Sequence, residues 1–125
     1  MRTATKLAQD YIALWNEADE ARRRAQLAAG WTPNATYVDP LMQGAGHAEI
    51  DALIAAVQQR FPTFQFSLMG TADAYADVAR FSWALGPKDG EAIVKGTDFV
   101  RRDGDKIAAV TGFLDLVPAA ARSAG

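Results

Sequence analysis

Three polar residues stand at positions where the surrounding pattern calls for apolar side chains. Tyr11 falls on the apolar stripe of a helical segment, where its hydroxyl needs a hydrogen-bond partner. Asp98 lies in the middle of a predicted strand, on its apolar side, where a carboxylate is costly unless it is hydrogen-bonded or protonated. Asp39 precedes the proline that stops the stretch "ATYVDP" (35–40). A tyrosine and two carboxylates around one cavity could remove a proton from a bound molecule and stabilise the anion that forms.

Each of these positions also has a purely structural interpretation. Tyr11 can be a core tyrosine, and Asp39 can cap the turn at the proline. Asp98 faces outward if the strand register is shifted by one residue, because such a shift moves every side chain to the other face. The chemical interpretation therefore requires that all three side chains converge on one cavity.

The first half of the chain is predicted to be mainly helical. Asp19 is placed to cap a second helix that ends at Gly30, and its three arginines at 22–24 are expected to face solvent. Residues 32–34 are predicted to form a turn, 35–39 a strand and 44–46 a flexible break. Pro62 ends a third helix. The apolar stripe of the first helix comprises Leu7, Tyr11, Leu14, Trp15 and Ala18, and that of the third comprises Ile50, Leu53, Ile54, Val57 and Phe61.

After Pro62 the apolar period changes from 3.6 to 2, which predicts strands. These cover residues 63–70, 78–85, 92–102 and 106–117, with a hairpin loop at 86–90 and a turn at 103–104. Strands that follow helices indicate an α+β fold. We expect a curved antiparallel sheet wrapped around the N-terminal helices, cone-shaped with an internal pocket. One domain is predicted for residues 1–118, followed by a C-terminal tail at 119–125.

Composition excludes several classes of protein. The chain has 125 residues and a net charge of −2, with no basic stripe for nucleic acid. It has no apolar run long enough for a membrane span and no apolar core of a signal peptide, so a cytoplasmic protein is expected. There is no cysteine and only one histidine, His47, so neither a metal site nor a Ser-His-Asp triad is expected. No cofactor site is evident.

Four stretches resemble signatures of the nuclear transport factor 2-like superfamily, which includes SnoaL-like polyketide cyclases and ketosteroid isomerases. They are "YIALWNEAD" (11–19), "TPNATYVDPL" (32–41), "GHAEI" (46–50) and "GTDFVRRDGDKIAAVTGFLD" (96–115). The resemblance covers about residues 5–117. It implies the cone-shaped α+β fold, but it specifies the reaction poorly, because this fold hosts many functions.

The resemblance to the isomerases implies roles for individual residues. Asp39 matches their general base, and Tyr11 and Asp98 match the donors of their oxyanion hole. A protonated Asp98 would be a carboxylic acid kept neutral so that it can donate a hydrogen bond. The ligand would be a hydrophobic small molecule, and an isomerisation or an aldol-type cyclisation would follow. The expected pocket walls comprise Trp15, Tyr37, Phe61, Phe81, Trp83, Leu85, Val110 and Leu114.

Several alternatives stay open. Tyr37 could hydrogen-bond to Asp39 and block it, which would leave a ligand-binding or accessory module without chemistry. By its resemblance to the cyclases, the chain could instead use Asp98 or Asp115 as the main acid-base group, although alternation points Asp115 outward. An epoxide hydrolase or a dehydratase is disfavoured, because Arg80 points outward and His47 is predicted to be an exposed residue near a helix cap. His47 at a lid near the cavity mouth is the alternative.

A homodimer is expected from the outer face of the sheet. The face opposite the pocket includes Ile93, Phe99 and Phe113, which would form a sizeable apolar patch if they were left exposed. A monomer in solution would count against this register.

Overall fold

The computed structural model describes residues 2–118, so the expected tail at 119–125 lies outside the described residues. The nine elements follow the predicted order, with one short strand added. They are α1 (Ala4–Asn16), α2 (Glu20–Gly30), β1 (Trp31–Val38), β2 (Gln43–Ala45), α3 (His47–Arg60), β3 (Phe64–Tyr75), β4 (Val78–Pro87), β5 (Val94–Asp103) and β6 (Lys106–Leu116). No helix among residues 2–118 is long and apolar enough to cross a membrane.

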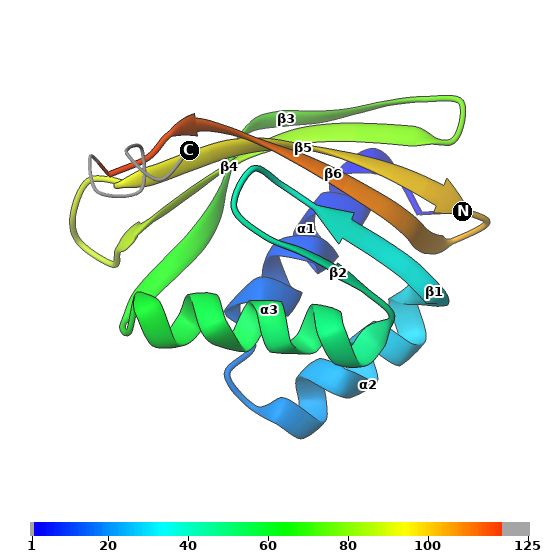
Figure 1. The fold of residues 1–125 in the computed structure, drawn as a ribbon. Helices are drawn as coiled ribbons and strands as arrows, with labels where there is room; N and C mark the ends of the chain where they lie inside the picture. Colours follow the sequence, from blue (N-terminus) through cyan, green and yellow to red (C-terminus); the bar gives the residue numbers. More distant parts are fainter. Residues whose placement is uncertain (1, 119–125) are drawn as a thin grey trace.

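The six strands form one open, curved sheet in the order β2-β1-β6-β5-β4-β3 (Figure 1). Strands β3 to β6 form the expected antiparallel meander, and β2 pairs antiparallel with β1. The pairing of β1 with β6 is parallel, so the sheet is mixed. The expected flexible break at 44–46 is wrong in part, because Gly44 and Ala45 belong to β2.

The helices lie on the concave face of the sheet (Figure 1). Asp19 caps α2 as predicted, because its side chain accepts a hydrogen bond from the Arg22 backbone nitrogen at 2.8 Å. The core between helices and sheet contains the fully buried residues Leu7, Leu14, Leu27, Ile50, Ile54, Phe81, Val100, Ile107 and Val110. The predicted α+β architecture is therefore confirmed.

The start of β1 differs from the prediction. The strand begins at Trp31, so residues 32–34 are part of it and do not form a turn. Its register against β6 shifts between Trp31 and Thr36, and the exposed Pro33 lies in this irregular stretch. Bulges are among the few places where a sheet tolerates proline, because its missing N–H then breaks no ladder bond.

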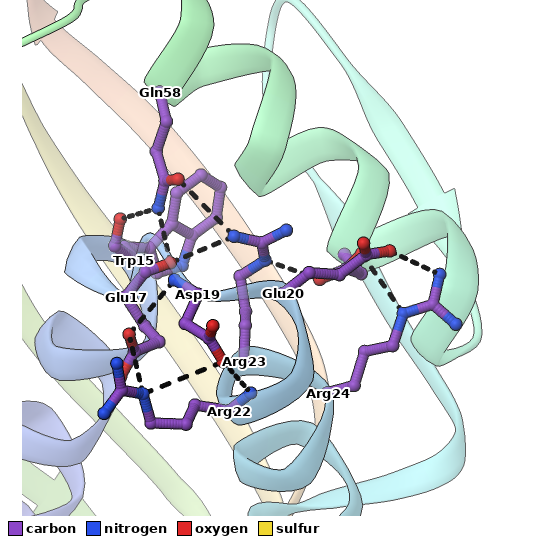
Figure 2. A network of polar contacts seen from close by, with 9 residues as sticks. Trp15, Glu17, Asp19, Glu20, Arg22, Arg23, Arg24 and Gln58 are labelled. Carbon is purple, nitrogen blue, oxygen red and sulfur yellow. Dashed lines mark hydrogen bonds and ion pairs between the residues drawn. The ribbon is translucent and has the colours of Figure 1, made fainter.

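The arginine triplet does not lie entirely in solvent, which corrects the prediction. Successive residues of a helix point in directions about 100° apart, so one of three neighbours faces the interior. Arg23 is 4% exposed, and its Nε lies 2.5 Å from Asp51 Oδ1 on α3. Its Nη1 donates to the backbone oxygen of Glu17 at 3.0 Å, and Gln58 Nε2 donates to the backbone oxygen of Trp15 at 3.0 Å (Figure 2). This network ties the end of α1 to α3.

The outer face of the sheet carries exposed apolar side chains. Phe113 is 55% exposed, and its ring centroid lies 5.8 Å from that of Phe99. Ile93 was expected on this face, but it is partly buried and packs against the core. It precedes the first residue of β5, so strand alternation does not govern its direction.

Candidate active site

A cavity of about 260 Å³ opens between α1, α3 and the concave face of the sheet. Its floor is formed by buried side chains, whereas Leu41 and Arg60 at its rim are exposed. The described lining comprises Tyr11, Ile12, Trp15, Tyr37, Asp39, Leu41, Met42, Ala56, Val57, Arg60, Phe61, Phe66, Trp83, Leu85, Val94, Asp98, Leu114, Val117 and Pro118. Tyr11, Asp39 and Asp98 thus face one apolar cavity.

Asp98 lies on the inner face of β5 and is 2% exposed. The Tyr11 hydroxyl donates a hydrogen bond to Asp98 Oδ2 at 2.5 Å, and Trp83 Nε1 donates to Oδ1 at 3.1 Å. Gly96 allows the second contact, since a Cβ atom there would lie 2.4 Å from Trp83 Cζ2. The carboxyl group is therefore held in one orientation by donors from α1 and β4.

Burial controls the protonation of this cluster. Desolvation raises the pKa of Asp98 to about 6, against the lowering effect of the hydrogen bonds from Tyr11 and Trp83. The pKa of Tyr11 is raised well above its ordinary value, first by burial and then by the charge of Asp98. Asp98 can therefore change its charge near neutral pH, whereas Tyr11 keeps its proton.

Asp39 caps a turn and also lines the cavity. Its Oδ1 accepts hydrogen bonds from the backbone nitrogens of Leu41 and Met42 at 2.8 and 2.9 Å, which caps the turn after β1. Its Oδ2 accepts a hydrogen bond from the Tyr37 hydroxyl at 2.7 Å and belongs to a half-buried residue of the cavity lining. A carboxylate offers about four acceptor sites, and these three hydrogen bonds leave one of them unfilled among residues 2–118.

Gly112 on β6 lets the two carboxylates approach each other. A Cβ atom on this residue would lie 2.8 Å from Asp98 Oδ1, 3.3 Å from Asp39 Cβ and 3.6 Å from the Tyr37 hydroxyl. Burial and then the charges of Asp98 and Asp39 raise the pKa of Tyr37, so it remains a protonated donor. The floor of the cavity is a cluster of two carboxyl groups and two tyrosines.

Six of the eight predicted wall residues line the cavity, namely Trp15, Tyr37, Phe61, Trp83, Leu85 and Leu114. The structure places the other two elsewhere, in the core behind the lining. Phe81 packs its ring against Tyr11 with centroids 5.0 Å apart, and Val110 is 1% exposed. Alternation assigns a side chain to a face of the sheet, but it does not say whether other side chains cover it.

The sequence reasoning missed Phe66 and Arg60 in the lining. Phe66 had a usable signal, because alternation along β3 places it beside other apolar residues on one face. Asn16 fixes this part of the wall, since its side chain donates to the Phe66 backbone oxygen at 2.9 Å and accepts from the Phe66 nitrogen at 2.8 Å. Arg60 had no local signal, because it ends a helix like many surface arginines.

The other candidate residues lie outside the cavity. Asp115 is exposed on the outer face and accepts a hydrogen bond from the Thr97 hydroxyl at 2.8 Å. Arg80 is exposed, with Asp73 3.6 Å away. His47 is half-buried, which differs from the expected exposed residue, and its Nε2 lies 2.9 Å from the Thr32 backbone oxygen. It does not line the cavity among residues 2–118, so it forms no lid there.

Within the described part of the chain, no three acidic or histidine side chains are grouped so that they could hold a metal ion. Arg102 is the one strand arginine with a buried side chain in residues 2–118, since the register of β5 shifts between Arg101 and Arg102. Its Nη1 donates to the Arg2 backbone oxygen at 2.9 Å, away from the cavity lining. The buried polar groups of the cavity lining therefore include the tyrosine and carboxyl cluster, and Arg60 is an exposed cation of the same lining.

Comparison with known proteins shows which sequences and structures this chain is similar to. A sequence model of the SnoaL-like domain matches residues 8–110. A proposed isomerase of the SnoaL-like family from Agrobacterium tumefaciens strain C58 is 45% identical, with a TM-score of 0.85 over 90% of this chain and 97% of that chain. No protein with a curated description matches.

Two more distant crystal structures share the fold. A proposed ketosteroid isomerase from Kribbella flavida is 20% identical, with a TM-score of 0.68 over 92% of this chain and 79% of that chain. A proposed SnoaL-like polyketide cyclase from Jannaschia is 15% identical, with a TM-score of 0.68 over 92% of this chain and 90% of that chain. At these identities the likeness concerns the fold alone.

Proposed function

Because this chain belongs to the SnoaL-like domain family, we propose that it is a cofactor-independent acid-base enzyme that acts on a hydrophobic carbonyl compound. The observation that carries the proposal is the pairing of Tyr11 with Asp98 opposite Asp39, across Gly112, at the floor of an apolar cavity. The reaction is an isomerisation or an aldol-type cyclisation. Both begin when a proton leaves the carbon next to a carbonyl group.

Asp39 accepts this proton at its open acceptor site, and negative charge develops on the carbonyl oxygen of the substrate. Tyr11 must then donate to that oxygen, although its hydroxyl donates to ionised Asp98 in the resting state. When Asp98 is protonated, its own O–H donates to the Tyr11 oxygen over the same 2.5 Å, and the phenol hydrogen turns toward the substrate. The enolate then takes this proton back from Asp39 at another carbon, or it attacks a second carbonyl group, whose oxygen takes the proton from Asp39.

A second candidate function is favoured by the hydrogen bonds of Asp39. Its carboxylate accepts from two backbone nitrogens and from Tyr37, so it is already stabilised without any substrate. In this interpretation the cluster orders the cavity floor, and the protein binds a hydrophobic small molecule without changing it.

Asp39→Asn separates the two functions. The amide oxygen can still cap the turn, but the base is lost, so turnover of a β,γ-unsaturated ketone should fall by about 10²- to 10⁴-fold. Isomerisation is followed by the absorbance of the conjugated enone, and the affinity for a phenol is measured by calorimetry. The control is Asp115→Asn on the outer face. Unchanged turnover in Asp39→Asn excludes Asp39 as the base, and phenol binding by a wild-type protein without turnover supports the binding module.

We also propose that the protein is a homodimer that pairs through the outer face of its sheet. Val38, Phe99 and Phe113 are 41%, 37% and 55% exposed there, which is unusual for apolar side chains on one sheet face. Light scattering should give twice the mass of the chain, and Phe113→Lys should give the monomer mass. A wild-type monomer would refute this interface.

A further inference from the structure

The cavity has a chemical polarity from floor to rim. Asp98 at the floor is 2% exposed and can be negatively charged, and Asp39 lies beside it. Leu41, Ala56 and Arg60 at the rim are exposed, and Arg60 is the one basic residue in the described lining. A ligand therefore meets negative charge at its buried end and positive charge at its outer end.

The guanidinium of Arg60 has no carboxylate partner within residues 2–118, whereas Arg22, Arg23 and Arg24 each lie within 4.0 Å of one. The guanidinium contacts the Phe61 ring, whose centroid lies 5.8 Å from Cζ. Both residues line the cavity and Arg60 is exposed, so this contact places the cation beside the cavity wall. The helix dipole gives the C-terminus of α3 about half a unit of negative charge. Arg60, in the last turn, carries a full positive charge, so the net charge at this helix end is positive.

We propose that the natural ligand carries an anionic group, with a carboxylate as the best match, at the end remote from its carbonyl group, and that Arg60 binds this group. A planar guanidinium can hold a carboxylate with two parallel hydrogen bonds. The negative floor repels the anionic end and the rim attracts it, so the ligand enters with its neutral carbonyl end first. The substrate class is thus a hydrophobic keto acid, a proposal that rests on the proposed function of the cavity.

Two matched probes test this orientation by calorimetry. The first is 4-(4-hydroxyphenyl)butanoate, and the second is the corresponding neutral amide; the phenol of each fits the polar floor. Wild-type protein should bind the carboxylate about fivefold more tightly than the amide, the upper range for a solvent-exposed ion pair. Arg60→Gln should abolish this preference and Arg60→Lys should retain part of it. In ~0.5 M salt the preference should shrink, because the charges are then screened.

Arg101→Gln is the matched control, because it removes an exposed arginine that does not line the cavity. Its preference for the carboxylate should equal that of the wild type. An equal preference in Arg60→Gln and wild-type protein overturns the inference while the acid-base function stands. If Arg60→Gln loses the preference for the carboxylate over the amide while the wild-type protein turns over no ketone, that result supports the role of Arg60 and argues against the acid-base function. Failure of both probes to bind the wild type overturns the inference, whereas the acid-base function is judged separately by turnover of the ketone.

Discussion

Asp98→Asn tests whether burial controls the charge of the cavity floor. The pKa of Asp98 is about 6 in the folded protein, against 3.8 for an ordinary aspartate, because burial disfavours its charged form. Between these two pH values the folded protein holds a proton that the unfolded chain has released. Stability therefore falls as pH rises through this window. The two values correspond to about 3 kcal/mol, at about 1.36 kcal/mol per pH unit.

The assay is urea unfolding of the wild type and of Asp98→Asn at intervals from about pH 2.5 to pH 7.5, a range that brackets the two pKa values. The difference in unfolding free energy between the two proteins should change by about 3 kcal/mol across this range, in favour of the variant at high pH. Any constant cost of the amide cancels in this comparison. Other titrating groups, such as Asp10 with its lowered pKa, cancel as well.

Asp89→Asn provides the control, because Asp89 is exposed in the turn after β4 and is not one of the two carboxylates, Asp39 and Asp115, whose charges raise the pKa of Asp98. The pH-dependent difference expected for Asp98→Asn should be absent from this variant. If the difference in unfolding free energy between wild type and Asp98→Asn does not change with pH, this result refutes the reasoning. Asp98 would then have the same pKa in the folded protein and in the unfolded chain. A difference of opposite sign would show that the hydrogen bonds from Tyr11 and Trp83 outweigh burial.

Three further substitutions test how the cavity is built. Gly96→Ala brings a methyl group 2.4 Å from Trp83 Cζ2, so it should lower the free energy of unfolding, measured in urea, by about 1–3 kcal/mol. Its control is Gly30→Ala, which should be tolerated because the added methyl group meets nothing closer than 3.9 Å. Gly112→Ala crowds Asp98 Oδ1 at 2.8 Å and should weaken phenol binding by at least about tenfold in calorimetry. Unchanged binding would show that the carboxyl group moves aside at no cost. Arg23→Gln leaves the buried Asp51 with Arg24, whose Nε lies 3.5 Å from Oδ2, as a remaining ion-pair partner, and should cost up to about 3 kcal/mol in urea unfolding. The exposed Arg22→Gln should cost little.

The parts of the site that were predictable from the sequence depend on local periodicity. Helical spacing places Tyr11 on the buried stripe of α1, and strand alternation places Asp98 on the inner face of β5. Both directions follow from a few neighbouring residues. The convergence of the two side chains followed only because all strands of the meander share one buried face.

The parts that were not predictable depend on partners far away in the sequence. Arg23 faces inward because it pairs with Asp51 on α3. This carboxylate is far from residues 22–24 in the sequence, so the local pattern gives no sign of it. Phe81 and Val110 do not line the cavity: Phe81 packs against Tyr11 of α1, and Val110 is 1% exposed in the core. The double role of Asp39 depends on the backbone after Pro40, which closes a turn that local residues alone leave ambiguous.

The parallel pairing of β1 with β6 has a consequence for folding kinetics. Tyr37 lies opposite Val110, so this pairing joins residues 73 positions apart, whereas β3 to β6 pair with their neighbours along the chain. Contacts of long sequence separation form slowly because loop closure costs entropy before any contact compensates it. Asp39 reaches Gly112 and Asp98 only after β1 has docked, so ligand affinity should appear in the slowest refolding phase. Ligand binding during refolding can therefore report this last pairing directly.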